Sequence, residues 1–352
     1  MIKLLHSADW HLDSPLMLRS EEQTQLLRQT LQSIPGQIAR LCRDHGCHML
    51  LLSGDIFDGP ASPATVAAVR NALEEVQIPV FISPGNHDFM DPNSPWLRER
   101  WPGNVHIFTH PTIESVAIPQ LDCRVYGAGF SGMDCPPLLE GFTAQQTERY
   151  AIGVLHGDPT QTRSPYCPIT AQQVEQSGLD YLALGHIHKA GSFTAGKTLC
   201  AWPGCPAGRG FDEQGEKGVS LITLEESAKL EFLSLDAPRF YDLQIPATQT
   251  LSSILPPVGN HDFYRITMTG PSEPLDLDAM QAQFSQFPNL MLRDRTTPPV
   301  DIWGAIGEDS LEGLYFKRLR DALDQADEDR QRQIRLAAQI SRQLLDGQEV
   351  AL

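Results

Sequence analysis

The sequence predicts an α/β fold in which helices and strands form layers, with one large N-terminal domain and a smaller C-terminal one. Short apolar runs alternate with segments whose apolar residues recur every three or four positions. The chain of 352 residues is longer than one typical domain. A stretch rich in Pro, Thr and Ser follows residue 238, so we expect domains of residues 1–237 and 238–352.

The expected elements follow from this alternation. Strands of the first domain are expected at residues 2–7, 49–53, 80–83, 105–108, 124–127, 151–155 and 181–184. Helical spacing covers residues 26–41 and 66–76. After Gly191 the pattern becomes hairpin-like, with strands near 198–202, 219–224 and 230–235. The second domain is expected to hold strands at 263–269 and near 290–293, a helix around 275–284 and two C-terminal helices.

Acidic residues outnumber basic ones by 44 to 27, which gives a formal net charge of −17. A protein that binds nucleic acid by itself would carry a basic excess instead. If the substrate is a polyanion, bound divalent cations or a basic or ATP-driven partner must therefore offset this charge.

The apolar run near residues 49–53 is too short to cross a bilayer, and acidic and histidine residues near the N-terminus are unlike an export signal. Seven dispersed cysteines, an odd number, fit reduced thiols. We expect a cytoplasmic protein with no membrane contact. Cys42 and Cys47 with His45 and His48 resemble a zinc cluster, but they lie where a helix ends and a buried strand begins, which favours a packing role.

Five segments place side chains that bind metals directly after a predicted strand. They are SADWHLDSP with Asp9 and His11, LSGDIFDG with Asp55, SPGNHD with Asn86 and His87, LHGD with His156, and LGHIHK with His186 and His188. Loops at the carboxyl edge of a sheet are where α/β proteins collect ligands. One such motif is usually structural, but five in this arrangement predict a single site.

Carboxylate, amide-oxygen and imidazole ligands without cysteine favour Mn²⁺ and are unlike the ligands of a tetrahedral structural zinc site. Fe and Zn are alternative ions for the same ligands. The set is large enough for two divalent ions, and we expect Asp55 to bridge them. Gly54, Gly85 and Gly185 are expected to permit the sharp turns that aim the next side chain into the site.

The series D-x-H, G-D-x-x-D, G-N-H-D, H-G and G-H-x-H resembles the calcineurin-like metallophosphoesterases, with every block in the family's order. Over residues 1–235, segments such as DWHLDSP, GDIFD and LDYLALGHIHK resemble the bacterial DNA-repair exonuclease branch related to Mre11 and SbcD, especially its YhaO-type members. FYRITMTG resembles a strand of that branch's C-terminal region. The resemblance implies a β-sandwich of two mixed sheets flanked by helices, with a small C-terminal α/β cap domain.

The resemblance also implies a role for each site residue. The first ion would be held by Asp9, His11, Asp55 and His188, and the second by Asp55, Asn86, His156 and His186. His87 would stabilise the scissile phosphate or protonate the leaving oxygen, and Asp88 would orient its ring. Asp58 stands where some Mre11-type nucleases carry a histidine, a departure that bears on nuclease specificity.

Several segments keep two interpretations. The pentapeptide GNHDF recurs at residues 259–263 after the ligand set is complete, and we expect that copy to be a turn. The loop PAGRGFDEQGEKG is either a shaped loop near the site, with Arg209 as a phosphate contact, or a plain surface hairpin. Trp10 and Phe89 either stack on a DNA base or pack in the core. The C-terminal helices either close a domain core or dock a partner, which in the Mre11 relatives is an SMC-like (Rad50-like) ATPase.

The expected function is hydrolysis of DNA as an exonuclease in DNA repair, by a hydroxide activated between two divalent ions. A phosphatase or a small cyclic-nucleotide phosphodiesterase on the same scaffold is the first alternative, because a fold and its metals do not determine the substrate. A non-catalytic scaffold that recruits an ATPase is the second. Whether the protein forms a homodimer stays open at this point.

Overall fold

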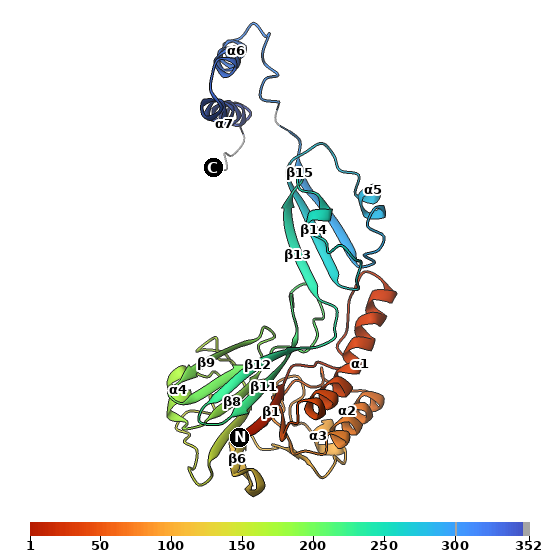
Figure 1. The fold of residues 1–352 in the computed structure, drawn as a ribbon, viewed down its shortest axis with the longest axis vertical. Helices are drawn as coiled ribbons and strands as arrows, with labels where there is room; N and C mark the ends of the chain where they lie inside the picture. Colours follow the sequence, from red (N-terminus) through yellow and green to blue (C-terminus); the bar gives the residue numbers. More distant parts are fainter. Residues whose placement is uncertain (300, 348–352) are drawn as a thin grey trace. The chain divides into compact units, whose positions relative to one another are not determined.

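The computed structural model describes residues 1–299 and 301–347, which form two compact units (Figure 1). Unit 1 comprises Met1–Tyr241 and His261–Phe263, and unit 2 comprises the remaining described residues. The chain thus first leaves unit 1 close to the boundary expected at residue 238. The functional division into a nuclease domain (1–237) and a cap or docking domain (238–352) stays a prediction.

Unit 1 contains two six-stranded mixed sheets. The first has the order β12 (Ala228–Ser234), β11 (Gly218–Leu224), β1 (Ile2–Ser7), β2 (Met49–Leu52), β3 (Val80–Ile82), β4 (Val105–Ile107). The second has the order β5 (Glu114–Ile118), β6 (Cys123–Gly127), β7 (Tyr150–His156), β8 (Tyr181–Gly185), β10 (Thr198–Trp202), β9 (Gly191–Ala195). In each sheet four neighbouring strands are parallel and the others antiparallel.

The two sheets pack face to face, and helices cover their outer faces. Alternation along β1 illustrates this arrangement, because successive side chains of a strand point to opposite faces. Leu4 belongs to the cluster that joins the two sheets, together with Ile152 of β7. Leu5 belongs to the cluster formed with helices α1 (Glu21–Asp44) and α2 (Pro63–Val76). The predicted layered α/β fold with two mixed sheets is therefore confirmed.

Short helices complete unit 1. Helix α4 (Ala171–Gln176) buries Val174 against the second sheet, and α3 (Pro95–Arg98) buries Trp96. Strands β5 and β9 escaped the sequence analysis because they are edge strands with many half-exposed positions, and their sequences lack a continuous apolar run.

Cys42 and Cys47 are buried where α1 ends, and His48 Nδ1 accepts the backbone N–H of Lys3 at 3.0 Å. Their packing role is as expected. None of the seven cysteines, all of which lie in the described part of the chain, forms a disulfide.

A three-stranded sheet, which lies in unit 2 except for the first residues of β13 and β14, has the order β13 (Phe240–Pro246), β14 (Phe263–Pro271), β15 (Leu290–Thr297). Strands β14 and β15 are parallel, and helix α5 (Leu277–Ala282) lies between them in the sequence. Helices α6 (Leu311–Asp324) and α7 (Glu328–Leu345) pack on each other around Phe316 and Ala338. Strand β13 was not expected from the sequence, because its polar and half-exposed residues run directly into the Pro- and Thr-rich stretch.

Within residues 1–299 and 301–347, every helix is too short or too polar to span a lipid bilayer.

Candidate metal centre

The ends of β1, β2, β3, β7 and β8 bring the seven predicted metal ligands into one cluster. Nε2 of His11 lies 3.1 Å from Nε2 of His188. Oδ1 of Asn86 lies 3.0 Å from Nε2 of His156 and 3.2 Å from Nδ1 of His186. Three of these side chains, Asp9, His11 and His188, have ligand atoms within 4.8 Å of one another, and so do Asp9, Asp55 and His156.

Asp55 lies between the two halves of this cluster. Its Oδ2 atom is 3.7 Å from Nε2 of His11 and 3.4 Å from Nε2 of His156. Its other oxygen, Oδ1, accepts the backbone N–H of His87 at 2.9 Å. One carboxylate oxygen therefore faces both sets of imidazoles, which is the position that a bridging ligand requires.

Several ligands have a left-handed backbone, which non-glycine residues adopt at a cost of about 1–2 kcal/mol each. The φ angles are 54° at Asp9, 46° at His11, 52° at Asp55 and 100° at His186. Hydrogen bonds between the loops hold this conformation: Asp9 N–H donates to Gly54 O at 3.0 Å, and His11 N–H donates to Asp55 O at 2.9 Å. Such strain concentrates at functional sites because the surrounding structure over-determines it.

Gly54, Gly85 and Gly185 lie around His156. The expected reason for glycine, a sharp turn, applies to only one of them. Only Gly54 has a positive φ, 87°. At Gly85 a Cβ atom would lie 2.3 Å from Oδ1 of Asp55, and at Gly185 it would lie 2.0 Å from the carbonyl oxygen of Ser53. Close approach of neighbouring loops, rather than turn geometry, therefore requires glycine at 85 and 185.

The facing nitrogens of His11 and His188 fit a cation between them. Nδ1 of His188 lies 2.7 Å from Oε1 of Glu213, and Nδ1 of His11 lies 3.4 Å from Oδ1 of Asp58. In the neutral tautomer with the proton on Nδ1, which a carboxylate partner favours, each Nε2 presents a lone pair. Two lone pairs that face each other at 3.1 Å repel unless a positive ion lies close to both.

His156 also faces acceptor atoms. Its Nδ1 donates to the carbonyl oxygen of Ser53 at 2.8 Å, so its Nε2 carries a lone pair. That lone pair faces Oδ1 of Asn86 and Oδ2 of Asp55, both of which are acceptors. The residues present thus fit two cations, one on each side of Asp55.

Burial and neighbouring charges control protonation at the cluster. Burial raises the pKa of Asp9. Burial would also raise the pKa of Asp55, but the imidazoles of His156 and His11 and the N–H of His87 outweigh it and lower that pKa. Burial lowers the pKa of His186 to about 4, with His156 contributing, and the imidazole is therefore neutral, as a metal ligand must be.

The structure corrects the role of Asp88. Its carboxylate accepts backbone N–H groups of Gly85 at 2.7 Å, Ile56 at 2.8 Å, Asp55 at 3.2 Å and Phe57 at 3.3 Å. It therefore ties two ligand loops together and does not orient His87. The prediction failed because Asp88 directly follows His87 in the sequence, whereas its side chain points back into the loops.

Asp58 holds His87 instead. Its Oδ1 atom lies 2.7 Å from Nδ1 of His87, and this hydrogen bond raises the pKa of the histidine. The hydrogen bonds from His11 and His87 hold the pKa of Asp58 well below its usual range. The second aspartate of G-D-x-x-D was visible in the sequence, but only folding shows which histidine it meets.

The two aromatic candidates pack in the protein. Trp10 is 1% exposed, lies in the core beside α1, and donates its indole N–H to Oγ of Ser7 at 2.8 Å. Of its two interpretations, packing in the core is therefore the one that holds, and stacking on a DNA base is excluded because no face of the ring reaches solvent. Phe89 packs against the cluster around the second sheet.

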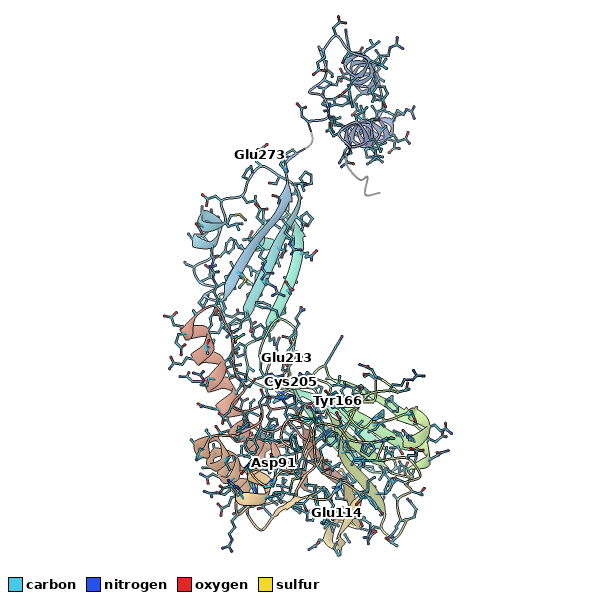
Figure 2. All side chains as sticks on the ribbon, turned by 180° about the vertical axis from the view of Figure 1, so that it is seen from behind. Asp91, Glu114, Tyr166, Cys205, Glu213 and Glu273 are labelled. Carbon is cyan, nitrogen blue, oxygen red and sulfur yellow. The ribbon has the colours of Figure 1, made fainter. Side chains whose placement is uncertain are left out.

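Arg209 lies at the metal centre, so the loop that contains it is a shaped loop and not a plain hairpin. Its guanidinium pairs with Glu213, and Nη2 lies 3.3 Å from Nδ1 of His188. The buried Lys217 donates from Nζ to the carbonyl oxygen of His188 at 3.2 Å, and Cys205 N–H reaches the same oxygen at 3.3 Å. Figure 2 shows Glu213 beside Cys205 in unit 1.

Glu213 and Lys217 are not predictable from the sequence, since a carboxylate and an amine in a Gly-rich loop carry no ligand spacing. Only their burial, to 5% and 7% exposure, distinguishes them from ordinary loop charges. Both act on His188, through its ring and its backbone.

The second GNHDF copy is structural. Nδ2 of Asn260 donates to the hydroxyl of Tyr264 at 3.1 Å, and Oδ1 of Asp262 accepts the N–H of Arg239 at 2.8 Å. The segment is irregular, with a bend at His261, and leads into β14. Among the described residues, its histidine and aspartate belong to no group of three metal-binding side chains.

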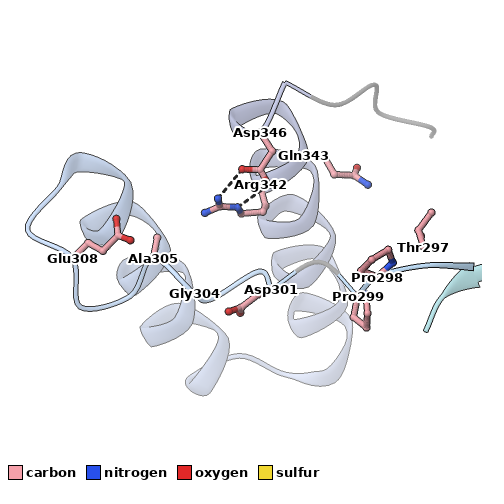
Figure 3. A pocket seen from close by; sticks show the side chains of 10 residues that line it. All are labelled: Thr297, Pro298, Pro299, Asp301, Gly304, Ala305, Glu308, Arg342, Gln343 and Asp346. Atoms are coloured by element: carbon pink, nitrogen blue, oxygen red, sulfur yellow. Dashed lines mark hydrogen bonds and ion pairs between the residues drawn. The ribbon is translucent and has the colours of Figure 1, made fainter. Parts of the chain in front are cut away.

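A separate cavity of about 660 Å³ in unit 2 is drawn in Figure 3. Arg342 in its wall already pairs with Asp346 at 2.7 Å and with Glu312. Among residues 1–299 and 301–347, this cavity contains no group of metal-binding side chains.

Known proteins resemble this chain in sequence. The sequence model described as calcineurin-like phosphoesterase matches residues 2–190. YhaO, a metallophosphoesterase of Bacillus subtilis (strain 168), is 32% identical over 237 residues, which are 63% of this chain and 57% of YhaO. The SbcD component of the nuclease SbcCD from the same organism is 23% identical over 265 residues, which are 63% of this chain and 66% of that protein. This chain thus spans less than two thirds of either relative.

Among solved structures, a dimetal phosphatase from Danio rerio aligns with a TM-score of 0.44 and 14% identity, over 66% of this chain and 98% of that one.

Proposed function

Because the chain belongs to the calcineurin-like phosphoesterase family, we propose that it is a metal-dependent phosphodiester hydrolase that degrades DNA as an exonuclease in DNA repair. The observation that carries the proposal is the pair of acceptor clusters that face each other across Asp55. Residues 1–237 would form the nuclease domain, and residues 238–352 a cap or docking domain.

Family members generally use two divalent metal ions. We assign Asp9, His11, Asp55 and His188 to the first ion, and Asp55, Asn86, His156 and His186 to the second. Mn²⁺ is the ion that this mixture of carboxylate, amide and imidazole ligands favours. When bound, two such ions would supply an activated water at neutral pH and would neutralise charge on the phosphoryl group.

His87 would supply the proton for the leaving oxygen. Nδ1 donates to Asp58, and this hydrogen bond raises the pKa of the ring, which favours the form that also carries a proton on Nε2. The ring is 42% exposed, which lets a substrate approach it. When the phosphodiester bond breaks, Nε2–H donates to the departing oxygen and the neutral imidazole remains, still bonded to Asp58.

The choice of DNA rests on the similarity to a relative named as part of a nuclease. With a net charge of −17 the protein should bind DNA weakly without help. We therefore propose an ATPase partner of the SMC or Rad50 type that docks on the apolar residues of α6 and α7. Leu311, Leu344 and Leu345 are 85%, 62% and 57% exposed there. We place the reaction in the cytoplasm, in keeping with the reduced cysteines.

The test is degradation of end-labelled linear duplex and single-stranded DNA in Mn²⁺, with the candidate ATPase and without it. Asp55→Asn and His87→Ala should abolish cleavage. His261→Ala is the matched control, because it removes the histidine of the second GNHDF copy, and it should retain wild-type activity. Cleavage of cyclic nucleotides or phosphomonoesters with DNA left intact would replace the exonuclease by a small-substrate esterase.

A further inference from the structure

A cavity of about 190 Å³ opens beside the metal centre. Its walls come from the segment that follows His11, from one face of α1 and from the start of α2. The polar residues that line it include Asp13, Ser14, Arg28 and Gln32. Neither the metal ligands nor the proton donor uses it.

Ser14 connects this cavity to the metal centre. Its backbone N–H donates to the carbonyl oxygen of His11 at 3.1 Å. Its hydroxyl lies 3.5 Å from Nη1 of Arg209, and Nη2 of that guanidinium lies 3.3 Å from Nδ1 of His188. A group bound in the cavity would therefore lie next to residues that contact His11 and His188.

The cavity wall carries one cationic side chain, Arg28, and one anionic side chain, Asp13. Arg28 is 55% exposed, and its acidic neighbour Glu21 is 3.9 Å away and 83% exposed, so this pair is weak. The carboxylate of Asp13 is already engaged, because it accepts the N–H of Ser62 at 2.7 Å and the hydroxyl of Thr65 at 2.8 Å. A guanidinium with a weakly held partner binds phosphate through several N–H groups at once.

We propose that this cavity is a subsite for a second phosphate of the substrate, with Arg28 as its main contact and Gln32 as a further donor. The inference rests on the proposed function, since the first phosphate is the one held at the metal centre. It makes the substrate a chain of nucleotides, or a nucleotide with two phosphates, rather than a simple phosphomonoester.

Calorimetric titration of the Mn²⁺-loaded protein tests the subsite without a need for catalysis. The ligands are thymidine 5′-monophosphate and thymidine 3′,5′-bisphosphate, which differ by one phosphate. We expect the bisphosphate to bind about tenfold more tightly to the wild type, as one charge-assisted contact provides. Arg28→Gln should remove this difference. Arg40→Gln, an exposed arginine on the same helix outside the cavity wall, should keep it.

Other results of this titration distinguish the subsite from the exonuclease proposal. Equal affinities of the wild type for the two ligands would overturn the subsite. An equal loss of the affinity difference in Arg28→Gln and Arg40→Gln would also overturn it, because the effect would then come from the overall charge of the protein. A difference that depends on Arg28 in a protein that leaves DNA intact would support the subsite and refute the exonuclease. If the protein degrades DNA and the affinity difference persists in Arg28→Gln, the exonuclease proposal is supported and the subsite is refuted. Equal melting temperatures of the two variants exclude misfolding.

Discussion

The carboxylate of Asp58 accepts a hydrogen bond from Nδ1 of His87, with 2.7 Å between the two atoms. The same Oδ1 atom lies 3.4 Å from Nδ1 of His11. One carboxylate therefore orients both a metal ligand and the candidate proton donor. It contacts both the metal site, through His11, and the proton donor His87. Removal of its charge should therefore lower kcat more than it lowers the stability of the fold.

Asp58→Asn should lower kcat about 10- to 100-fold, the usual effect of removing an outer hydrogen bond from a site histidine. The amide keeps the shape of the carboxylate, but it carries no charge to hold His87 protonated. Steady-state kinetics with bis(p-nitrophenyl) phosphate measure the change, and thermal denaturation serves as the control. Unchanged kcat would mean that His87 needs no orienting carboxylate.

Asp88→Ala should destabilise the protein instead, by about 3 kcal/mol, because it leaves buried backbone donors of two loops without an acceptor. Urea denaturation in the presence of EDTA measures this loss without a contribution from bound metal. If the variant keeps its stability and loses only activity, Asp88 acts on the chemistry as the sequence first suggested.

Glu213→Gln should weaken Mn²⁺ binding about 10- to 100-fold, since the neutral amide no longer holds the proton on Nδ1 of His188. Glu216→Gln is the matched control on the same loop, where Glu216 is 53% exposed and pairs with Arg239. Titration calorimetry with Mn²⁺ compares the two. Equal affinity in both variants would contradict a role for Glu213 in positioning His188.

Gly85→Ala should abolish metal binding, because the added Cβ would lie 2.3 Å from Oδ1 of Asp55 and displace that carboxylate. Gly103→Ala has open space around its Cβ and should leave metal affinity unchanged. Mn²⁺ affinity again provides the measurement. Wild-type affinity in Gly85→Ala would show that the loops yield more readily than their close approach implies.

His6 should make the protein less stable in acid. It is buried between the hydroxyl of Tyr181 at 2.7 Å and that of Ser53 at 2.8 Å, and burial lowers its pKa from 6.5 to about 3. Below pH 6.5 His6 binds a proton in the unfolded chain but not in the folded protein. The free energy of unfolding therefore decreases as the pH is lowered, until the pH reaches the pKa of the folded state. The loss from this residue is about 2 kcal/mol between pH 6.5 and pH 5.

His6→Gln should therefore show a flatter dependence of unfolding free energy on pH than the wild type over this range. Urea denaturation of the metal-free proteins at several pH values provides the comparison. Parallel curves would indicate that His6 is protonated in the folded protein.

The sequence by itself determined the α/β layering, the order of most strands and the seven side chains that meet at the strand ends. It could do so because apolar runs and the polar residues after them are local patterns, and parallel strands bring their carboxyl ends to one edge. It also distinguished the two GNHDF copies, since only one of them follows a buried strand in the ligand series.

Only the tertiary structure decided how the surroundings of those ligands are arranged. It paired His87 with Asp58 rather than with its neighbour Asp88, brought Glu213 to His188 from 25 residues further along the chain, and buried Trp10 beside α1. These contacts depend on which loops converge and which way each side chain points. No spacing along the chain encodes that, because the packing of the two sheets and the outer helices sets it.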